Sequence, residues 1–327
     1  MDQWLRDNLV CPRDHKSLEE TGSSLICPDG HKYPVIDGIP VMLLDEVIPT
    51  QWNTTSTLNR VAAYQAGQPS DLPDLLSRQS DGIDPHVQDI VSATCGNLYG
   101  PLVNRLSRYP IPELRLPQSS GEMFLDIGCN WGRWCVAAAR KGYNPVGIDP
   151  AIEAIIAARK VSRQLGVQGR YAVADARYLP FAPHTFDTAF SYSVLQHFSK
   201  ENARLALAEV SRVLKQDGLS LIQMPNAYGV RSLYYQVKRG FREGQDFDVR
   251  YWTPSELKTT FSKIIGKTTA TVDGYFGLGI QPSDVDLLPT KYQLVVRASE
   301  LLRRVSLRVR WMVNFADSIY LTSVKDT

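Results

Sequence analysis

The sequence predicts an α/β protein with a doubly wound, mainly parallel sheet, preceded by a small β module. From Met123 onward, short apolar runs alternate with helical patterns, which is typical of a parallel sheet with helices on both faces. Before residue 45, two similar turns with cysteine and histidine precede a strand-and-turn pattern. We therefore expect domains at 1–45 and 122–327, joined by a connector and helical cap at 46–121.

Composition places the chain among ordinary folded proteins. Of the 327 residues, 43% are hydrophobic and 21% are charged, and a formal net charge of +2 does not by itself indicate a nucleic-acid partner. The five cysteines are too few and odd in number for a disulfide framework, so we expect a cytoplasmic location. We find no apolar signal core and no run near the roughly 20 apolar residues of a transmembrane segment.

The N-terminal module offers ligands for a metal ion. Its turns at 11–15 and 27–31 each read Cys-x-x-x-His. Two such turns can give zinc two thiolates and two imidazoles. The stretch 33–43 then carries the strand-and-turn pattern that closes a ribbon.

The connector gives weaker signals. Proline, glycine, serine and aspartate are scattered from Pro49 to Pro85, which predicts a poorly regular segment. From Val87 to Leu106 the apolar spacing is compatible with one or two helices.

The segment Met123–Gly132 reads as a buried strand followed by a glycine turn, and a helix follows it. Asp126 ends the strand, and the small residues after it let a ligand lie against bare backbone, facing the turn amides. A dinucleotide loop reads G-x-G-x-x-G, but here Asn130 and Arg133 replace the second and third glycines. Asparagine tolerates positive φ, so we expect the turn itself to form.

Two further strands end in carboxylates. Asp149 ends the second strand, where an acidic side chain can accept both ribose hydroxyls of a nucleoside. Asp175 ends the third strand, and the fourth strand is 186–191. Open α/β sheets bind ligands at the carboxyl ends of their strands, so these side chains predict a ligand site at one edge.

The C-terminal third completes the sheet and adds two insertions. We expect strands at 219–224, 268–275 and 318–324, with insertions at 227–252 and 276–317. Thr253 to Glu256 form a capping box with proline at the first helical position. Within the second insertion, Lys291 to Arg310 predicts a basic amphipathic helix, whose apolar face would hold Leu294, Ala298, Leu301, Leu302 and Val305.

The order of these motifs resembles class I S-adenosylmethionine (SAM)-dependent methyltransferases of the type 11-like group, whose first motif is D/E-x-G-x-G-x-G. The resemblance is close from Phe124 to Asn226 and loose outside it. It implies a Rossmann-like seven-stranded sheet, whose last strand runs antiparallel between the fifth and sixth, and SAM as cofactor. The cofactor-binding residues that it implies are Asp126, Gly128, Asn130, Gly132, Asp149, Asp175, Ala176 and Ser191.

The N-terminal module resembles the zinc-ribbon-like proteins that partner methyltransferases, and the ribbon of a family of ribosomal-RNA guanine methyltransferases. Cys11, Cys27 and His31 match the ligands of that ribbon, but Asp14 stands where its second cysteine belongs. The resemblance thus implies zinc with Asp14 or His15 as fourth ligand, or else a ribbon that has lost its metal. Such a ribbon could also dock a protein partner.

Residues after the fourth strand are candidates for contact with the methyl acceptor. His197 is a candidate general base because an imidazole titrates near working pH, and its alternative role is to cap a helix or bind a backbone carbonyl. Tyr99 would reach the acceptor from the helical cap, or else be a core tyrosine. The remaining acceptor candidates are Gln196, Arg231, Arg250 and Tyr251.

Three functions are consistent with these residues. The first is methylation of a hydroxyl or carboxyl group on a small-molecule or glycan-type acceptor, which the arginines of the insertions suggest is anionic. The second is RNA methylation, favoured by the ribbon and the basic, aromatic C-terminal part, but not by Ser191–Val194, which differs from the N/D-P-P-F/Y of base-amine enzymes. The third, a non-catalytic SAM-binding adaptor, is least favoured because the cofactor carboxylates are intact.

Overall fold

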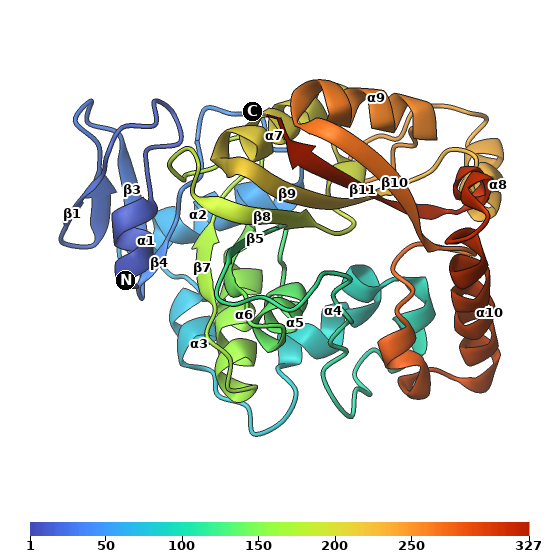
Figure 1. Cartoon of the computed structure of the whole chain (residues 1–327). Helices are drawn as coiled ribbons and strands as arrows, with labels where there is room; N and C mark the ends of the chain where they lie inside the picture. The colour runs from blue at the N-terminus through green and yellow to red at the C-terminus, as the bar shows by residue number, and fades with distance from the viewer. Residues whose placement is uncertain (327) are drawn as a thin grey trace.

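The computed structural model describes residues 1–326 and contains two sheets (Figure 1). The larger sheet has seven strands in the order β10-β11-β9-β8-β5-β6-β7. Strands β5 to β9 pair in parallel, and β11 pairs antiparallel with both β9 and β10. This is the expected Rossmann-like sheet, with the last strand between the fifth and sixth. The bounds are β5 Met123–Ile127, β6 Asn144–Asp149, β7 Arg170–Val173, β8 Phe186–Ser191, β9 Leu214–Pro225, β10 Gly266–Gly274 and β11 Ser318–Lys325.

Helices cover both faces of this sheet (Figure 1). On one face lie α5 (Arg133–Arg140) and α6 (Ile152–Gln164), and on the other lie α7 (Lys200–Val213) and α9 (Pro254–Ile264). Ser199 caps α7 by accepting a hydrogen bond from the Asn202 amide at 3.1 Å. Thr253 caps α9 in the predicted capping box.

The connector is more regular than the sequence predicts. It contains α2 (Trp52–Gln65) and α3 (Leu72–Ser77), followed by α4 (Pro85–Cys95) and η1 (Asn97–Leu102). The prediction of a poorly regular segment was wrong. Helix α2 is stabilised by tertiary contacts and not by an apolar stripe that could be read from the sequence. Its Thr57 hydroxyl donates to the carbonyl of Pro150 and accepts from the amide of Ile152, which ties α2 to the end of β6.

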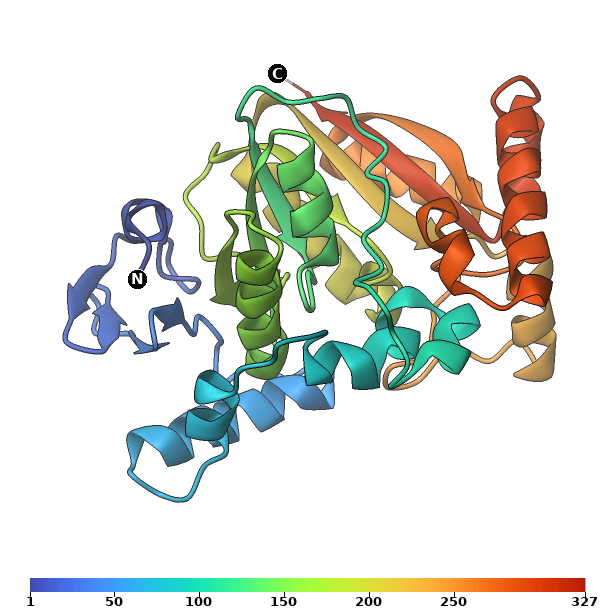
Figure 2. The same cartoon turned by 90° about the horizontal axis from the view of Figure 1, so that it is seen from below.

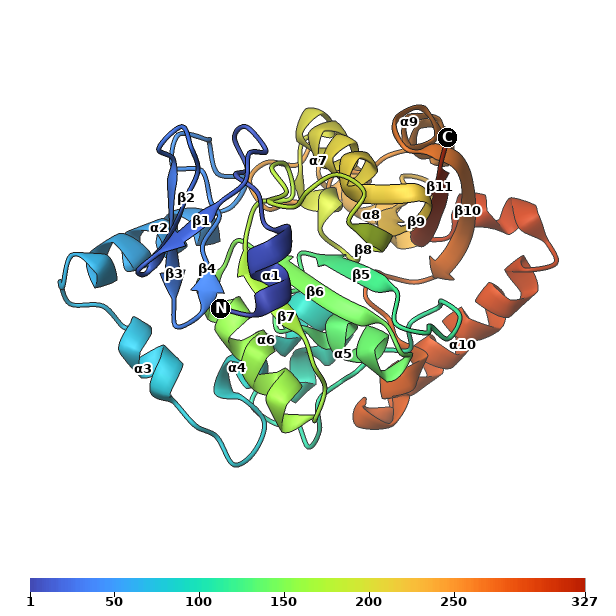
Figure 3. The same cartoon turned by 60° about the vertical axis from the view of Figure 1, so that its left-hand side comes forward.

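The N-terminal module packs against the β7 edge of the large sheet (Figure 3). It consists of α1 (Gln3–Asn8) and an antiparallel sheet of β1 (Glu19–Thr21), β2 (Ser24–Ile26), β3 (Lys32–Ile36) and β4 (Ile39–Pro40). Val41 pairs with Val173, and the amide of Met42 donates to the carbonyl of Val173 at 2.7 Å. The module therefore shares a hydrophobic core with the main sheet.

The two insertions form the edge of the molecule farthest from this module (Figures 1 and 2). They hold α8 (Val230–Lys238), η3 (Pro282–Leu287), α10 (Thr290–Ser306) and η4 (Arg310–Phe315). The predicted basic helix is thus present as α10. Its predicted apolar face points outward, since Leu294 and Leu301 are exposed while Val296 and Ser299 are buried. No helix within residues 1–326 has the length and apolarity needed to cross a membrane.

Candidate active site

The glycine turn between β5 and α5 forms the floor of the site. Gly128 has φ +73°, and a Cβ there would lie 2.3 Å from a methyl carbon of Val194, so neither the conformation nor the space admits a side chain. Asn130 has φ +46°, as its tolerance of positive φ predicts. Its Oδ1 accepts from the amide of Trp131 at 2.8 Å, which stabilises the turn.

Asp126, one residue before the end of β5, and Asp149, at the end of β6, are both buried. Burial raises the pKa of Asp126 to about 7, and its Oδ2 accepts from Cys135 Sγ at 3.3 Å. Burial also raises the pKa of Asp149 to about 6. The amides of Asn130 and Ala151 donate to separate oxygens of Asp149, which orients its carboxylate beside the turn.

Asp175, at the end of the third parallel strand, is held by a neighbouring cation. Arg177 donates to it from its backbone amide, from Nε and from Nη2, the last at 2.7 Å. Nε also lies 3.2 Å from the second carboxylate oxygen, so Arg177 makes four contacts with the two oxygens of Asp175. The same guanidinium donates to the carbonyl of Ile48, which attaches the connector to this edge.

A cavity of about 950 Å³ lies over these strand ends. Five of the predicted cofactor residues line it, namely Gly128, Asn130, Asp149, Asp175 and Ala176. Three others do not: Asp126 is buried beneath it, Gly132 is the N-cap of α5, and the Ser191 hydroxyl donates to the carbonyl of Ile127, joining β8 to β5. The predicted helical cap adds a wall at 92–94 and 96–98, and the connector adds one at 50–53 that the sequence did not reveal.

Gln196 and His197 line the cavity next to the strand ends. His197 Nδ1 lies 2.7 Å from the carbonyl oxygen of Phe247, so Nδ1 carries the proton and Nε2 holds a lone pair. Burial lowers the pKa of His197 to about 4, so the imidazole is neutral at pH 7. The side-chain amide of Gln196 donates to Nε2 at 3.1 Å. His197 was considered as a general base or as a residue that caps a helix or binds a backbone carbonyl, and in the structure it binds the carbonyl of Phe247.

The other acceptor candidates divide into two groups. Arg231 and Tyr251 line the cavity, whereas Tyr99 and Arg250 are not among its lining residues. Tyr99 is a core tyrosine whose hydroxyl donates to Asp284 at 2.5 Å. The Arg250 guanidinium donates to the carbonyls of His197, Asp246 and Asp248, so it fixes the loop that carries Phe247.

The family described as "Methyltransferase domain" matches residues 124–218, from the first parallel strand to the start of the fifth. The strand order, with an antiparallel last strand between the fifth and sixth, is that of class I methyltransferases. The chain carries a class I, SAM-dependent methyltransferase domain.

Two similar proteins match part of the chain. An uncharacterized protein of Methanocaldococcus jannaschii is 31% identical over 47% of this chain and 52% of its own length. The ubiquinone biosynthesis O-methyltransferase of Brucella ovis is 30% identical over 44% of this chain and 59% of its own length. The chain therefore spans only about half the length of these relatives.

Solved structures were also matched. The YcgJ protein of Bacillus subtilis gives a TM-score of 0.42 at 23% identity, covering 64% of this chain and 93% of its own. A SAM-dependent methyltransferase of Methanosarcina mazei gives a TM-score of 0.46 at 20% identity, covering 68% of this chain and 99% of its own.

Sequence reasoning missed Arg133, which begins the helix after the glycine turn of the methyltransferase domain. Its side chain is buried, and neither Nη atom has a hydrogen-bonding partner among the described residues. The guanidinium lies over the rings of Trp134 and Tyr192, at 5.4 and 5.8 Å from their centroids. Its charge lowers the pKa of Asp126, against the larger opposite effect of burial. The sequence feature that could have pointed to Arg133 is its position directly after the glycine turn.

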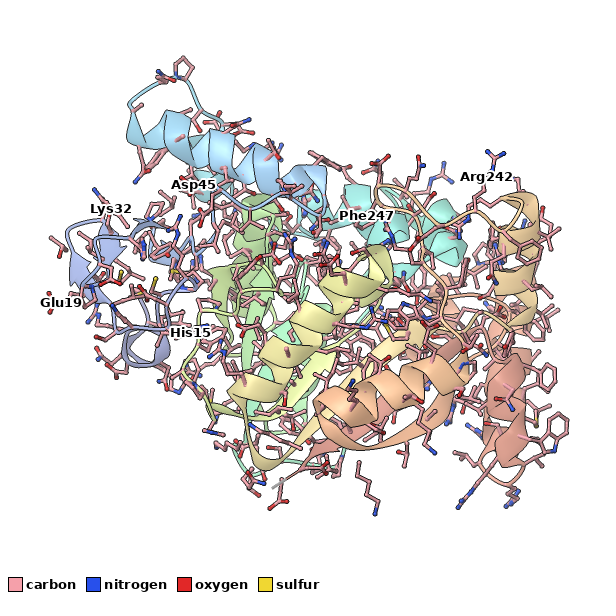
Figure 4. All side chains as sticks on the ribbon, turned by 90° about the horizontal axis from the view of Figure 1, so that it is seen from above. His15, Glu19, Lys32, Asp45, Arg242 and Phe247 are labelled. Atoms are coloured by element: carbon pink, nitrogen blue, oxygen red, sulfur yellow. The ribbon has the colours of Figure 1, made fainter. Side chains whose placement is uncertain are left out.

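The N-terminal module brings four candidate metal ligands together. Ligand atoms of Cys11, Asp14, Cys27 and His31 all lie within 4.8 Å of one another. This set of two thiolates, one imidazole and one carboxylate fits a tetrahedral zinc site. His15, the other candidate for the fourth ligand, points elsewhere: its Nε2 is 3.9 Å from Glu209 of α7, and Figure 4 shows it on the side of the module that faces the main domain.

Proposed function

We propose that the protein transfers the methyl group of SAM to a hydroxyl or carboxyl oxygen of a small, anionic acceptor such as a glycan-type molecule. One observation carries this proposal: a single cavity joins the carboxylates at the strand ends to a basic and aromatic wall. That wall is formed by the inner side of α8, with Arg231, Tyr235, Lys238 and Arg239. A volume of about 950 Å³ is at the upper end of small-ligand sites, which suits a cofactor and acceptor together.

The residues at the strand ends fit SAM. The Asp149 carboxylate lies on the cavity and can accept the two ribose hydroxyls, while Asp175 and the Ala176 amide lie where the adenine would be bound. Because Gly128 and the turn carry little side-chain bulk, the cofactor can approach the backbone closely.

SAM supplies a methyl group on a positively charged sulfur, which is already a good leaving group. The bond between the acceptor oxygen and the methyl carbon would form as the bond between that carbon and sulfur breaks. The electron pair of the carbon–sulfur bond would stay on sulfur. The protein mainly aligns the acceptor oxygen and excludes water. A carboxylate acceptor needs no base, whereas a hydroxyl must lose its proton.

His197 is our candidate for receiving that proton. Its Nε2 lone pair faces Gln196, so an acceptor hydroxyl that displaces the Gln196 amide can donate to Nε2 instead. An imidazole with a pKa of about 4 is a weak base, so proton transfer would follow C–O bond formation, when the oxygen has become strongly acidic.

The basic wall supports an anionic acceptor. Arginine binds carboxylate and phosphate through a planar fork that gives two bonds at once. Arg231 is only lightly engaged, at 3.4 Å from the carbonyl of Phe276 and 3.2 Å from the hydroxyl of Tyr235. It is therefore available to an acceptor without breaking a strong ion pair. The B. ovis relative, named as an O-methyltransferase, supports oxygen as the methylated atom.

The test is transfer of labelled methyl groups from SAM to fractionated cell extract, with and without ribonuclease. We expect label in small, anionic molecules that bind an anion exchanger and resist ribonuclease. Label in ribonuclease-sensitive material would instead support RNA methylation, and no transfer to any fraction, despite SAM binding, would support the adaptor.

A further inference from the structure

Helix α8 is turned with its apolar side toward solvent. Val230, Leu233 and Val237 lie at i, i+3 and i+7 and are 63%, 45% and 57% exposed. The opposite side, with Arg231 and Ser232, faces the protein: both of their backbone amides donate to Asp317, and both residues line the cavity. A helix on the surface of a water-soluble domain normally has the reverse orientation, so this apolar face has no partner within residues 1–326.

The neighbouring segments continue this apolar face. Trp311 and Phe315 of η4 are 64% and 51% exposed, with their rings edge to face at 5.8 Å. On α10, Leu301 is also exposed. The Asn226 side chain, just before α8, donates to the carbonyls of Val313 and Asn314, so η4 adjoins α8. We call this surface of Val230, Leu233, Val237, Leu301, Trp311 and Phe315 the outer face. Figure 1 shows α8 and α10 at the same edge of the molecule.

Basic residues accompany the outer face. Between residues 290 and 310 there are six lysines and arginines and one acidic residue, Glu300, which already binds Arg303 and Arg304. After α8 lies Arg242, which Figure 4 shows at the outer edge of the molecule. The surface therefore combines exposed apolar side chains with an excess of positive charge.

We propose that the outer face binds an anionic lipid surface. The leucines and valines would enter the boundary between headgroups and acyl chains, Trp311 would lie at headgroup level, and the lysines and arginines would bind the lipid phosphates. RNA explains this surface less well, because aliphatic side chains cannot stack on bases as aromatic ones do. A second copy of the chain is disfavoured because a twofold interface would bring the positive charges of both copies together.

The cavity and the outer face lie on opposite sides of α8. The inner side of α8 lines the cavity while its outer side belongs to the outer face, so a protein bound to a membrane would hold its acceptor site one helix away from the lipid. This inference does not depend on which atom is methylated. Methylation of an acceptor carried by a lipid would follow naturally, but the surface can be tested without an acceptor.

The experiment is flotation of the full-length protein with vesicles of phosphatidylcholine, alone or mixed with phosphatidylglycerol. We expect the protein to float with the mixed vesicles, more weakly in high salt, and not with phosphatidylcholine alone. The variant L233S/V237S should bind at least about tenfold more weakly, because it loses two buried apolar contacts. L205S is the matched control, since Leu205 on α7 is 44% exposed and lies outside this face.

SAM affinity of each variant, measured by calorimetry, checks that the fold is retained. A wild-type protein that floats with neither kind of vesicle would overturn the proposal, as would equal binding by L233S/V237S and L205S. Light scattering that shows a dimer disrupted by L233S/V237S would identify the outer face as a subunit interface instead. Binding of single-stranded RNA that the same variant abolishes, without vesicle binding, would assign the surface to RNA.

Discussion

Phe247 stacks on His197, with ring centroids 3.8 Å apart and planes 4° apart, while its carbonyl oxygen accepts the Nδ1 proton of that histidine. The loop that carries Phe247 is fixed by Arg250, so one loop both desolvates the imidazole and sets its tautomer. The other side of the Phe247 side chain is open to solvent, since the residue is 54% exposed, and Figure 4 shows it apart from the outer edge marked by Arg242.

This contact predicts a change in titration. Phe247→Ala should expose the imidazole, so the pKa of His197 should rise from about 4 toward the usual value of about 6.5. Nuclear magnetic resonance titration of the histidine ring measures this directly. Phe241→Ala is the control, because Phe241 is exposed and lies on the same segment. An unchanged midpoint for His197 in Phe247→Ala would show that the stacked ring does not desolvate it.

The same pKa makes a prediction for stability. In the unfolded chain His197 takes up a proton near about pH 6.5, and in the folded protein only near pH 4. Between these values the unfolded state binds more protons, so this residue makes the folded protein less stable as the pH falls. His197→Gln should therefore lose stability less steeply than the wild type over this range in denaturant titrations. Parallel slopes would contradict the assignment.

The metal site predicts opposite results for adjacent residues. Asp14→Ala should lower the zinc content and the melting temperature, since Asp14 lies in the ligand cluster, whereas His15→Ala should leave the zinc content unchanged. Asp14→Cys, which places a thiolate there, should retain the metal. Metal analysis of protein purified without a histidine tag decides the matter. Zinc lost in His15→Ala but kept in Asp14→Ala would reverse the assignment of the fourth ligand.

The burial of Arg133 predicts that replacing it changes thermal stability and SAM affinity differently. A buried guanidinium without hydrogen-bonding partners is costly, so a structure that keeps it suggests that it serves a ligand. Arg133 is not among the residues that line the cavity, so we propose that it supports SAM binding through Asp126, whose pKa its charge lowers. Arg133→Met should then leave the melting temperature of the SAM-free protein equal or higher, while SAM binding weakens. A lower melting temperature with unchanged SAM affinity would show that Arg133 is a structural residue.

Much of the fold could be predicted from sequence because its signals are local. The strand that carries Asp126, the carboxylate at the end of β6 and the N-cap at Thr253 each depend on adjacent residues, and each is present. The first strand runs one residue further than predicted, to Ile127. The regularity of α2 was missed, because it depends on bonds from Thr57 to residues near 150. The apolar side of α10 was identified, but the sequence did not indicate that it faces outward, because periodicity shows a face and not its direction.

The candidate site was predicted less completely, for the same physical reason. Residues attached to strand ends, such as Asp149 and Asp175, lie on the cavity because the topology of the sheet puts them there. Tyr99 and Arg250 were chosen for their chemistry alone, and each is held by partners distant in sequence, Asp284 for Tyr99 and the carbonyl of His197 for Arg250. Such partners become visible only in three dimensions.

The most direct test of this account is calorimetric titration of the protein with SAM and S-adenosylhomocysteine, comparing wild type with Asp149→Ala. We expect the wild type to bind both, and the variant to bind at least about 2 kcal/mol more weakly, which is about thirtyfold, because two ribose hydroxyls lose a charged acceptor. The Asp149→Ala protein should stay folded in circular dichroism. Equal affinity in a folded variant would contradict the placement of SAM over the ends of β5 and β6.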